Sequence, residues 1–233
     1  MSEKIKRHRH ETYSESKNSY LYRIFQKIII KARNNFFNLF KIYNDYTNNK
    51  SIIDIGSTPS IDIEQNNFLE NTKNNPYITC LSNQDCRILK KKYKNIKNIL
   101  IGDGKNTLLE DNSFDIVHSN ATIEHVGSFD NQVSFVREML RICRESIFIQ
   151  TPNRFYPIDF HTILPFIHWL PKNIHRKILK QLNLNFYSEE ENLNLLSIRE
   201  IKRICKILKL KKYKILKYKL FFFTSNLILI VYK

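Results

Sequence analysis

The sequence predicts an α/β fold built on a mostly parallel, seven-stranded sheet with helices on both of its faces. Short apolar segments alternate with helical ones along residues 51–151. Strands that are apolar on both sides and separated by helices are typical of a parallel sheet covered on both faces. Two further apolar segments close the chain near each other, which predicts an antiparallel hairpin at the end of the sheet.

Each element is expected from its own pattern of apolar residues. Helical spacing predicts a long first helix, with a break near Arg33 left open, and three later ones. A short turn at 224–226 would join the two closing strands. The predicted strands are 51–55, 77–81, 98–101, 114–119 and 146–151, then 213–223 and 226–232; the predicted helices are 17–43, 85–96, 130–143 and 197–210.

The chain is expected to form one domain with two additions. Residues 1–16 are polar and charged without an apolar stretch, so they predict a flexible basic leader and not a signal peptide. Residues 17–233 then form the domain, which begins with the helix at 17–43. The alternation stops over 152–196, where four prolines and many aromatic residues predict an inserted cap of short helices.

Composition limits the classes of function. The net charge is +16, but lysines are scattered through every segment and accompany many Asn and Ile residues. Nucleic-acid binding is therefore disfavoured, and attraction to anionic substrates or an acidic membrane surface is the safer inference. No apolar run approaches the roughly 18 residues of a membrane helix. Four cysteines without a C-x-x-C pair indicate a reduced, cytoplasmic protein.

Small and polar residues follow each predicted parallel strand. In open α/β sheets, ligands bind outside the carboxyl ends of the strands, so these residues are expected to share one edge. The ordered series indicates a ligand site more strongly than any single member. The segments are Asp54–Ser57, Ser82–Asp85, Gly102–Gly104, His118–Ala121 and Gln150–Asn153.

Three motifs in this series resemble the class I S-adenosylmethionine-dependent methyltransferases. They are "DIG" at 54–56, "GDG" at 102–104 ahead of "LLEDNSFDIVHSNATIEHV", and "FIQTPN" at 148–153. The resemblance covers residues 50–152 closely and the terminal hairpin loosely. Residues 151–171 look like the acceptor region of small-molecule or surface-glycan methyltransferases. The resemblance implies a Rossmann-like fold, an enzyme, and S-adenosyl-L-methionine as cofactor.

The resemblance also implies roles for residues at the strand ends. The first loop would lie at the methionine end of the cofactor and the third would hold the adenine. Either of two residues after strand two would face the ribose, where the family usually has an acidic residue directly at the strand tip. The implied cofactor-binding residues are Asp54, Gly56 and Ser57; Asn83 or Asp85; Asp103 and Gly104; and Ser119 and Asn120.

The first loop departs from the glycine-rich family pattern D-x-G-x-G-x-G. Thr58 and Ser60 replace the second and third glycines, and Pro59 between them fixes φ and removes a donor. S-adenosylmethionine carries no phosphate and needs no anion-binding nest, so this loop argues more against a dinucleotide than against S-adenosylmethionine. The absence of an acidic residue about 20 positions later argues the same way.

Candidate catalytic residues lie after strands four and five. Removal of a proton from an alcohol acceptor favours a histidine or a carboxylate. His125, His161 and Asp159 are the predicted catalytic residues, with Glu124 as a further candidate, and a packed histidine under the cofactor is an equal alternative for His125.

The predicted acceptor-binding residues are Arg154, Tyr156 and His161. No metal is expected: His161, His168 and His175 recur every seven residues, but Pro165 and Pro171 interrupt any continuous helix between them.

The leading hypothesis is an O-methyltransferase for a small polar acceptor, with anionic and sugar-linked molecules, including surface-glycan precursors, among the options. One alternative is an RNA or other nucleic-acid methyltransferase, motivated by the charge. Another is a non-catalytic relative of the fold that binds a partner protein. The oligomeric state is left open.

Overall fold

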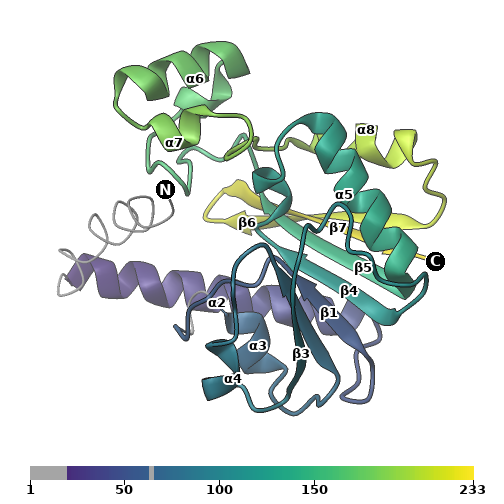
Figure 1. Ribbon diagram of the computed structural model, residues 1–233. Helices are drawn as coiled ribbons and strands as arrows, with labels where there is room; N and C mark the ends of the chain where they lie inside the picture. The colour runs from purple at the N-terminus through teal and green to yellow at the C-terminus, as the bar shows by residue number, and fades with distance from the viewer. Residues whose placement is uncertain (1–19, 63–65) are drawn as a thin grey trace.

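The computed structural model describes residues 20–62 and 66–233, so the predicted leader at 1–16 lies outside the described residues. Its centre is a seven-stranded sheet with the strand order β3-β2-β1-β4-β5-β7-β6 (Figure 1). Strands β1 to β5 pair in parallel, and β7 runs antiparallel to both β5 and β6. The predicted fold class is confirmed.

The elements follow the predicted order. The strands are β1 (Ile52–Ile55), β2 (Ile78–Ser82), β3 (Ile96–Ile101), β4 (Phe114–Asn120), β5 (Cys143–Pro152), β6 (Tyr213–Leu220) and β7 (Phe223–Tyr232). The helices are α2 (Tyr20–Tyr43), α3 (Asn67–Asn71), α4 (Leu89–Lys92), η1 (Ile123–His125), α5 (Phe129–Ile142), η2 (Ile167–Trp169), α6 (Lys172–Gln181), α7 (Asn185–Ser188) and α8 (Ile198–Ile207).

Two apolar cores lie on opposite faces of the sheet, which explains why the strands are apolar on both sides. In β1, Ile53 and Ile55 pack in the core that α5 and α8 cover, whereas Ile52 packs in the core under α2, α3 and α4 (Figure 1). Successive side chains of a strand point to opposite faces. Every residue of β1 is buried, as a central parallel strand requires.

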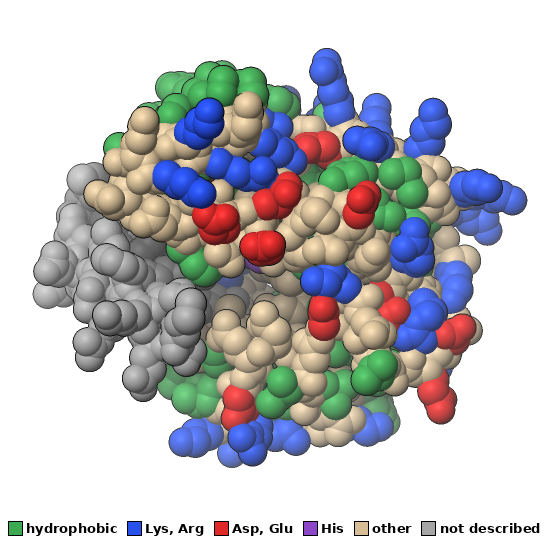
Figure 2. All heavy atoms as spheres, turned by 45° about the horizontal axis from the view of Figure 1, so that its top comes forward, with side chains coloured by type: hydrophobic (Ala, Val, Ile, Leu, Met, Phe, Trp, Pro, Cys, Tyr) green, Lys and Arg blue, Asp and Glu red, His purple; other side chains and the backbone are tan. Residues whose placement is uncertain are grey.

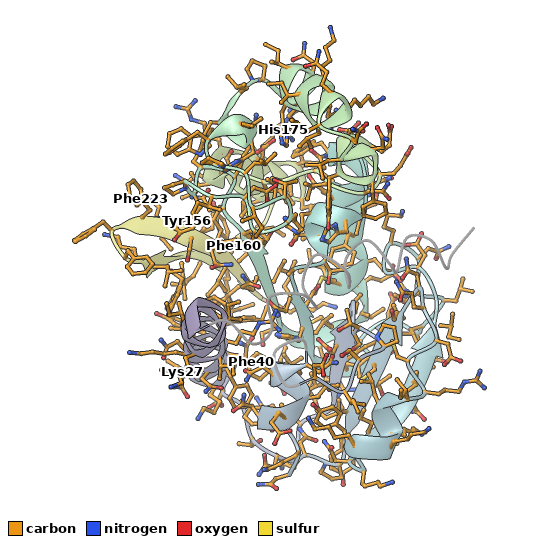
Figure 3. The ribbon with its side chains drawn as sticks, turned by 90° about the vertical axis from the view of Figure 1, so that its left-hand side faces the viewer. Lys27, Phe40, Tyr156, Phe160, His175 and Phe223 are labelled. Carbon is orange, nitrogen blue, oxygen red and sulfur yellow. The ribbon has the colours of Figure 1, made fainter. Side chains whose placement is uncertain are left out.

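Helix α2 runs without interruption through Arg33, so the break left open there does not occur. Near the end of α2, Phe40 is fully buried against the sheet (Figure 3). Its ring lies edge-on to those of Phe68, His118 and Phe148, with centroids 5.1–5.5 Å away. Such edge-to-face pairs add to the burial of the rings themselves.

The predicted turn at 224–226 was wrong, because the hairpin turns at Phe221–Phe222. Leu220 pairs directly with Phe223, and Phe221 adopts a left-handed φ of 56°. The segment 224–226 belongs to β7, where its carbonyls accept hydrogen bonds from Asn153 at the end of β5. Hydrogen bonds from the end of β5 therefore hold residues 224–226, which were predicted as a turn, in an extended conformation. The helix predicted at 85–96 is likewise shorter, confined to α4.

A buried carboxylate on α5 anchors the loop that follows β3. Glu138 accepts hydrogen bonds from the backbone N–H and the hydroxyl of Thr107, at 2.8 and 2.6 Å. The guanidinium of Arg141 donates two more, and also pairs with Asp111. Hydrogen bonds from Arg141 and Thr107 lower the pKa of Glu138 to about 2 despite its burial. This clamp fixes the loop over 103–111.

We expect Glu138→Gln to lower the free energy of unfolding at pH 7 by about 2 kcal/mol, the usual cost of losing hydrogen bonds to a charged group. For a chain of this size the melting temperature should fall by roughly 4–8 °C. Because the folded-state pKa lies below the ordinary 4.5, the stabilisation is complete above pH 5 and disappears as the pH falls toward 2. Urea unfolding of both proteins from pH 7 to 3 measures this difference. A difference that does not change with pH would contradict the charged clamp.

Candidate functional site

The order of the strands creates a crevice between β1 and β4. From β1 the chain builds the sheet outward through β2 and β3, then returns to place β4 on the other side of β1. Ile55 pairs with Ser119 in this register. At such a switch point the loops leave in opposite directions and open a ligand-binding crevice at the carboxyl ends of the strands.

Gly56 is required at the end of β1. Its φ is +95°, and a Cβ atom added there would lie 2.0 Å from the hydroxyl oxygen of Thr122. Its N–H donates to the carbonyl of Leu81 in β2, at 2.8 Å. The carbonyl of Ile55 accepts hydrogen bonds from the hydroxyls of Ser119 (2.9 Å) and Thr122 (3.3 Å). The first loop is therefore fixed against the loop after β4.

The carboxylate of Asp54 is buried and already bound by protein groups. His118 Nδ1 lies 2.6 Å from one oxygen, and the Ser57 hydroxyl donates to the other at 2.7 Å. The imidazole of His118 stacks on Phe68, with centroids 3.7 Å apart. Asp54, Ser57 and His118 thus hold one another in place at the end of β1. Sequence reasoning had not assigned a role to His118, and its place in the polar segment His118–Ala121 at the strand end was its only signal.

Asp103 and Gly104 lie at the tip of β3, on the same edge. The Asp103 side chain is more than half exposed and contacts Lys105 through the backbone N–H (2.9 Å) and the ammonium group (3.3 Å). A Cβ on Gly104 would lie within 2.8 Å of Ile55 and Phe135. Glycine therefore lets this turn pack directly on β1 and α5, while the carboxylate of Asp103 stays open to a ligand.

Asn83 and Asp85 follow β2 and are both exposed. Arg87 binds the Asp85 carboxylate through two nitrogens, and these hydrogen bonds lower the pKa of Asp85 to about 2. Asn83 has no such partner among the described residues, so it is the freer of the two to face a ribose.

Ser119 and Asn120 end β4, beside a small cavity between the sheet and α2. Ser119 is buried, whereas Asn120 lines the cavity with His118, Phe68 and Gln150. Asn120 and Gln150 are direct partners in the parallel pairing of β4 and β5. The side-chain amide oxygen of Gln150 is buried without a hydrogen-bond partner within residues 20–62 and 66–233. Polar side chains from the ends of β4 and β5 thus line part of this cavity, and phenylalanine rings line other parts of its sheet and helix walls.

The structure brings the three predicted catalytic residues together. His161 Nδ1 lies 3.1 Å from the Asp159 carboxylate, and His161 Nε2 lies 3.1 Å from His125 Nε2. His125 Nδ1 is 2.6 Å from the carbonyl oxygen of Asn192. Glu124 is fully buried, with one oxygen bound by Thr151 at 2.9 Å and the other 3.8 Å from His161 Nε2. Glu124 and His125, which follow β4, therefore form one cluster with Asp159 and His161 of the cap.

Electrostatics in this cluster differ between its two carboxylates. Burial raises the pKa of Glu124, because the charged form loses its hydration. Burial acts on Asp159 in the same direction, but hydrogen bonds from His161 and Thr162 outweigh it, and the pKa of Asp159 lies well below its usual range. Asp159 is therefore an ionised partner that orients His161.

His125 and His161 face each other through their Nε2 atoms. A hydrogen bond between these two atoms is impossible if both are unprotonated, because each would then only accept. A carbonyl or carboxylate oxygen only accepts, so each Nδ1 carries its proton toward its partner. In the neutral forms both Nε2 atoms then present lone pairs across 3.1 Å. A proton or a cation between them is needed to make this contact favourable.

The cap supplies the remaining predicted residues. Arg154 donates to the carbonyls of His168 and Leu170, at 3.0 and 2.7 Å, and burial lowers its pKa. Its guanidinium therefore already ties the cap together, and its role toward an acceptor stays a prediction. Tyr156 is buried and stacks on Phe160, with centroids 5.0 Å apart (Figure 3).

His168 and His175, which share the seven-residue spacing of His161, do not join the cluster. His168 Nε2 contacts the carbonyl of Tyr156 at 2.6 Å. Burial lowers the pKa of His175 to about 4, so this histidine is neutral at pH 7. His175 lies on α6, buried within the cap with its ring 6.4 Å from that of His168 (Figure 3).

A hollow opens between the cap and the body of the molecule (Figure 2). Acidic side chains lie along much of its rim on the cap side, and a histidine side chain is visible within it. Lysine and arginine side chains are spread mainly around the outside of this face. On the face shown, the described basic side chains are therefore not concentrated at the hollow.

Comparison with known proteins places the fold. Residues 54–148 match the sequence model of a family described as a methyltransferase domain. No curated protein matches the chain by sequence.

The chain is similar in structure to a SAM-dependent methyltransferase from Archaeoglobus fulgidus, with 14% identity, a TM-score of 0.57, and 92% of this chain and 100% of that chain covered. A SAM-dependent methyltransferase from Methanosarcina mazei is similar with 11% identity and a TM-score of 0.54, and the match covers 82% of this chain and 96% of that chain. The chain is also similar to a Haemonchus contortus phosphoethanolamine N-methyltransferase, which was solved with phosphomonomethylethanolamine and S-adenosylhomocysteine. The identity is 14%, the TM-score is 0.53, and the match covers 79% of this chain and 39% of that chain.

The chain thus has the Rossmann-like fold of class I methyltransferases. Together with the match over 54–148, this fold supports S-adenosylmethionine-dependent methyltransferase activity, with S-adenosylmethionine as the cofactor. The edge described above fits that cofactor, because it offers an exposed carboxylate at Asp103 and open space beside Gly102. Among the described residues, no helix has both the length and the apolar character needed to span a membrane.

We expect Gly56→Ala to destabilise the protein by roughly 2–5 kcal/mol, because it combines a left-handed φ with a clash. Gly102→Ala is the matched control: its φ is not left-handed and no atom lies within 4 Å of the added Cβ. Thermal denaturation should show a loss of at least about 5 °C for the first variant and a change under about 2 °C for the second. Adding Thr122→Ala to Gly56→Ala should restore part of the loss, and equal effects of the two glycine variants would refute this account of the loop.

Proposed function

We propose that this protein transfers the methyl group of S-adenosylmethionine to a hydroxyl oxygen of a small, polar acceptor, with anionic and sugar-linked molecules included in the class. The observation that carries the proposal is the cluster of His125, His161 and Asp159 beside the β1–β4 crevice. Its link to the crevice is Thr122, which contacts Gly56 and directly precedes η1.

The strand ends would hold the cofactor in the crevice. The exposed carboxylate of Asp103 is suited to accept a hydrogen bond from the amino group of adenine, and Asn83 is suited to the ribose hydroxyls. The methionine part would extend past Gly56 toward Ser119 and Asn120. Because S-adenosylmethionine has no phosphate, the Thr58 and Ser60 loop does not need an anion-binding nest.

S-adenosylmethionine supplies an activated methyl group on a sulfonium. The protein has to align the acceptor oxygen with that methyl group, exclude water, and promote loss of the hydroxyl proton. His125 and His161 would activate the hydroxyl, and Asp159 would orient His161 through its Nδ1–H. Arg154 and Tyr156 belong to the cap that would close over the acceptor.

A small molecule suits the hollow better than a nucleic acid does. Nucleic-acid sites gather lysine and arginine along the path of the phosphates. On the face shown in Figure 2, acidic side chains lie along the hollow and the basic ones lie mainly outside it. The aromatic contacts of the cap, such as the stacked pair of Tyr156 and Phe160, are also suited to a compact acceptor.

Isothermal titration with S-adenosylhomocysteine tests the cofactor site. We expect a dissociation constant in the micromolar range for the wild type and a value about 10- to 100-fold higher for Asp103→Ala, since a hydrogen bond to a charged group is lost. Glu110→Gln is the control, because this carboxylate lies on the same loop, is exposed and forms no ion pair with the described residues.

Titration of a duplex and a single-stranded RNA completes the test. The proposal expects no salt-dependent RNA binding at physiological ionic strength. Failure of the wild type to bind S-adenosylhomocysteine would overturn the proposed function, and tight RNA binding would favour the nucleic-acid alternative.

A further inference from the structure

Three potential ligand atoms converge in the cluster under the cap. They belong to Glu124, His125 and His161, and all lie within 4.8 Å of one another. The two histidine atoms are the Nε2 nitrogens, 3.1 Å apart, and the carboxylate oxygen lies 3.8 Å from His161 Nε2. Two imidazoles and one carboxylate form a donor set that binds zinc and related divalent metals.

The outer contacts of both histidines turn their Nε2 lone pairs inward. Nδ1–H of His125 faces the carbonyl of Asn192, and Nδ1–H of His161 faces the carboxylate of Asp159. Metal-bound histidines almost always donate their second N–H to such an oxygen, which fixes the tautomer and the orientation of the ring. The arrangement therefore presents two preoriented nitrogen donors to one point.

The third donor is a buried oxygen that lacks a partner. Glu124 has no exposed surface, and while one oxygen accepts a hydrogen bond from Thr151, Oε1 has no hydrogen-bond partner in the described part of the chain. A buried polar atom without a partner costs free energy. A metal ion between Glu124 and the two imidazoles would satisfy this oxygen and separate the two nitrogen lone pairs.

We propose that Glu124, His125 and His161 bind one divalent transition-metal ion of the zinc type. Nitrogen atoms 3.1 Å apart can both reach one ion at the usual Zn–N distance of about 2.0–2.1 Å, and a small movement of the carboxylate brings in its oxygen. The two imidazoles favour zinc over magnesium or calcium, which prefer oxygen ligands. No metal was expected from the sequence, where His161, His168 and His175 were the set considered, and the structure does not bring those three residues together. The site proposed here uses a different set of residues.

The site deepens the proposed function and rests on it for its role. Three protein ligands leave a coordination position open, as in catalytic zinc sites. An acceptor hydroxyl bound there would release its proton to solvent more readily, because the metal stabilises the alkoxide. The metal bound by the Nε2 atoms of His125 and His161 would thus activate the acceptor hydroxyl.

Metal binding to the full-length protein tests the site without any activity measurement. Chelator-treated protein is dialysed against Zn²⁺ to count bound ions, and titrated with Co²⁺ to record its visible absorption. We expect one equivalent per chain with nitrogen coordination. Glu124→Gln and His161→Ala should abolish this binding, and Asp159→Asn should weaken it about 10- to 100-fold, as loss of an outer-sphere partner does.

Two controls separate this site from other histidines. His175→Gln removes a histidine of the same cap, and a variant with His8→Ala and His10→Ala removes the closely spaced pair near the start of the sequence. Both should bind metal as the wild type does. The isosteric Glu124→Gln keeps the test interpretable if His161→Ala fails to fold.

Absence of saturable binding by the wild type, or unchanged binding by Glu124→Gln, would overturn the site and indicate that a proton is shared between the imidazoles. S-adenosylhomocysteine binding is measured on the same samples. Cofactor binding without metal binding refutes the metal site alone, and metal binding without cofactor binding refutes the proposed function alone.

Discussion

The neighbourhood of β1 and β4 is the constraint on which the candidate site depends. Because Ile55 pairs with Ser119, the loops after both strands start at the same place and leave in opposite directions. The contact between Gly56 and Thr122 joins the loop of the cofactor crevice to the short helix η1, which carries Glu124 and His125. The crevice and the histidine cluster are therefore two parts of one local structure.

Several polar groups that are buried beside this junction have partners that define their orientation. Asp54 is held by His118 and Ser57, whose hydrogen bonds offset the cost of burying a carboxylate. The imidazole of His118 in turn packs between the rings of Phe68 and Phe148. In the cap, the Asp159 carboxylate likewise orients the imidazole of His161 through a contact with its Nδ1. Among the described residues, the Oε1 atom of Glu124 lacks such a partner, as do the side-chain oxygens of Gln132 and Gln150. Glu124 Oε1 also lies 3.8 Å from His161 Nε2, which is why the cluster is the place to look for a bound ion.

Much of the fold could be predicted from the sequence, because the strands are short and apolar on both faces. The strand-end series also predicted the edge on which Asp103 lies. The extent of the pairing between β5 and β7 could not be predicted from the sequence. Because β7 continues alongside the end of β5, the polar segment 224–226, which was predicted as a turn, belongs to β7. Nor could sequence periodicity show that His161 meets His125 instead of His168, since that contact depends on how the cap folds back onto η1.

A crystal structure of the full-length protein with S-adenosylhomocysteine tests the central claim most directly. The account predicts the ligand across the ends of β1, β2 and β3, with the adenine amino group within hydrogen-bonding distance of the Asp103 carboxylate and the sulfur toward Asn120. A crevice that stays empty at saturating ligand, or an adenine bound away from residue 103, would contradict it.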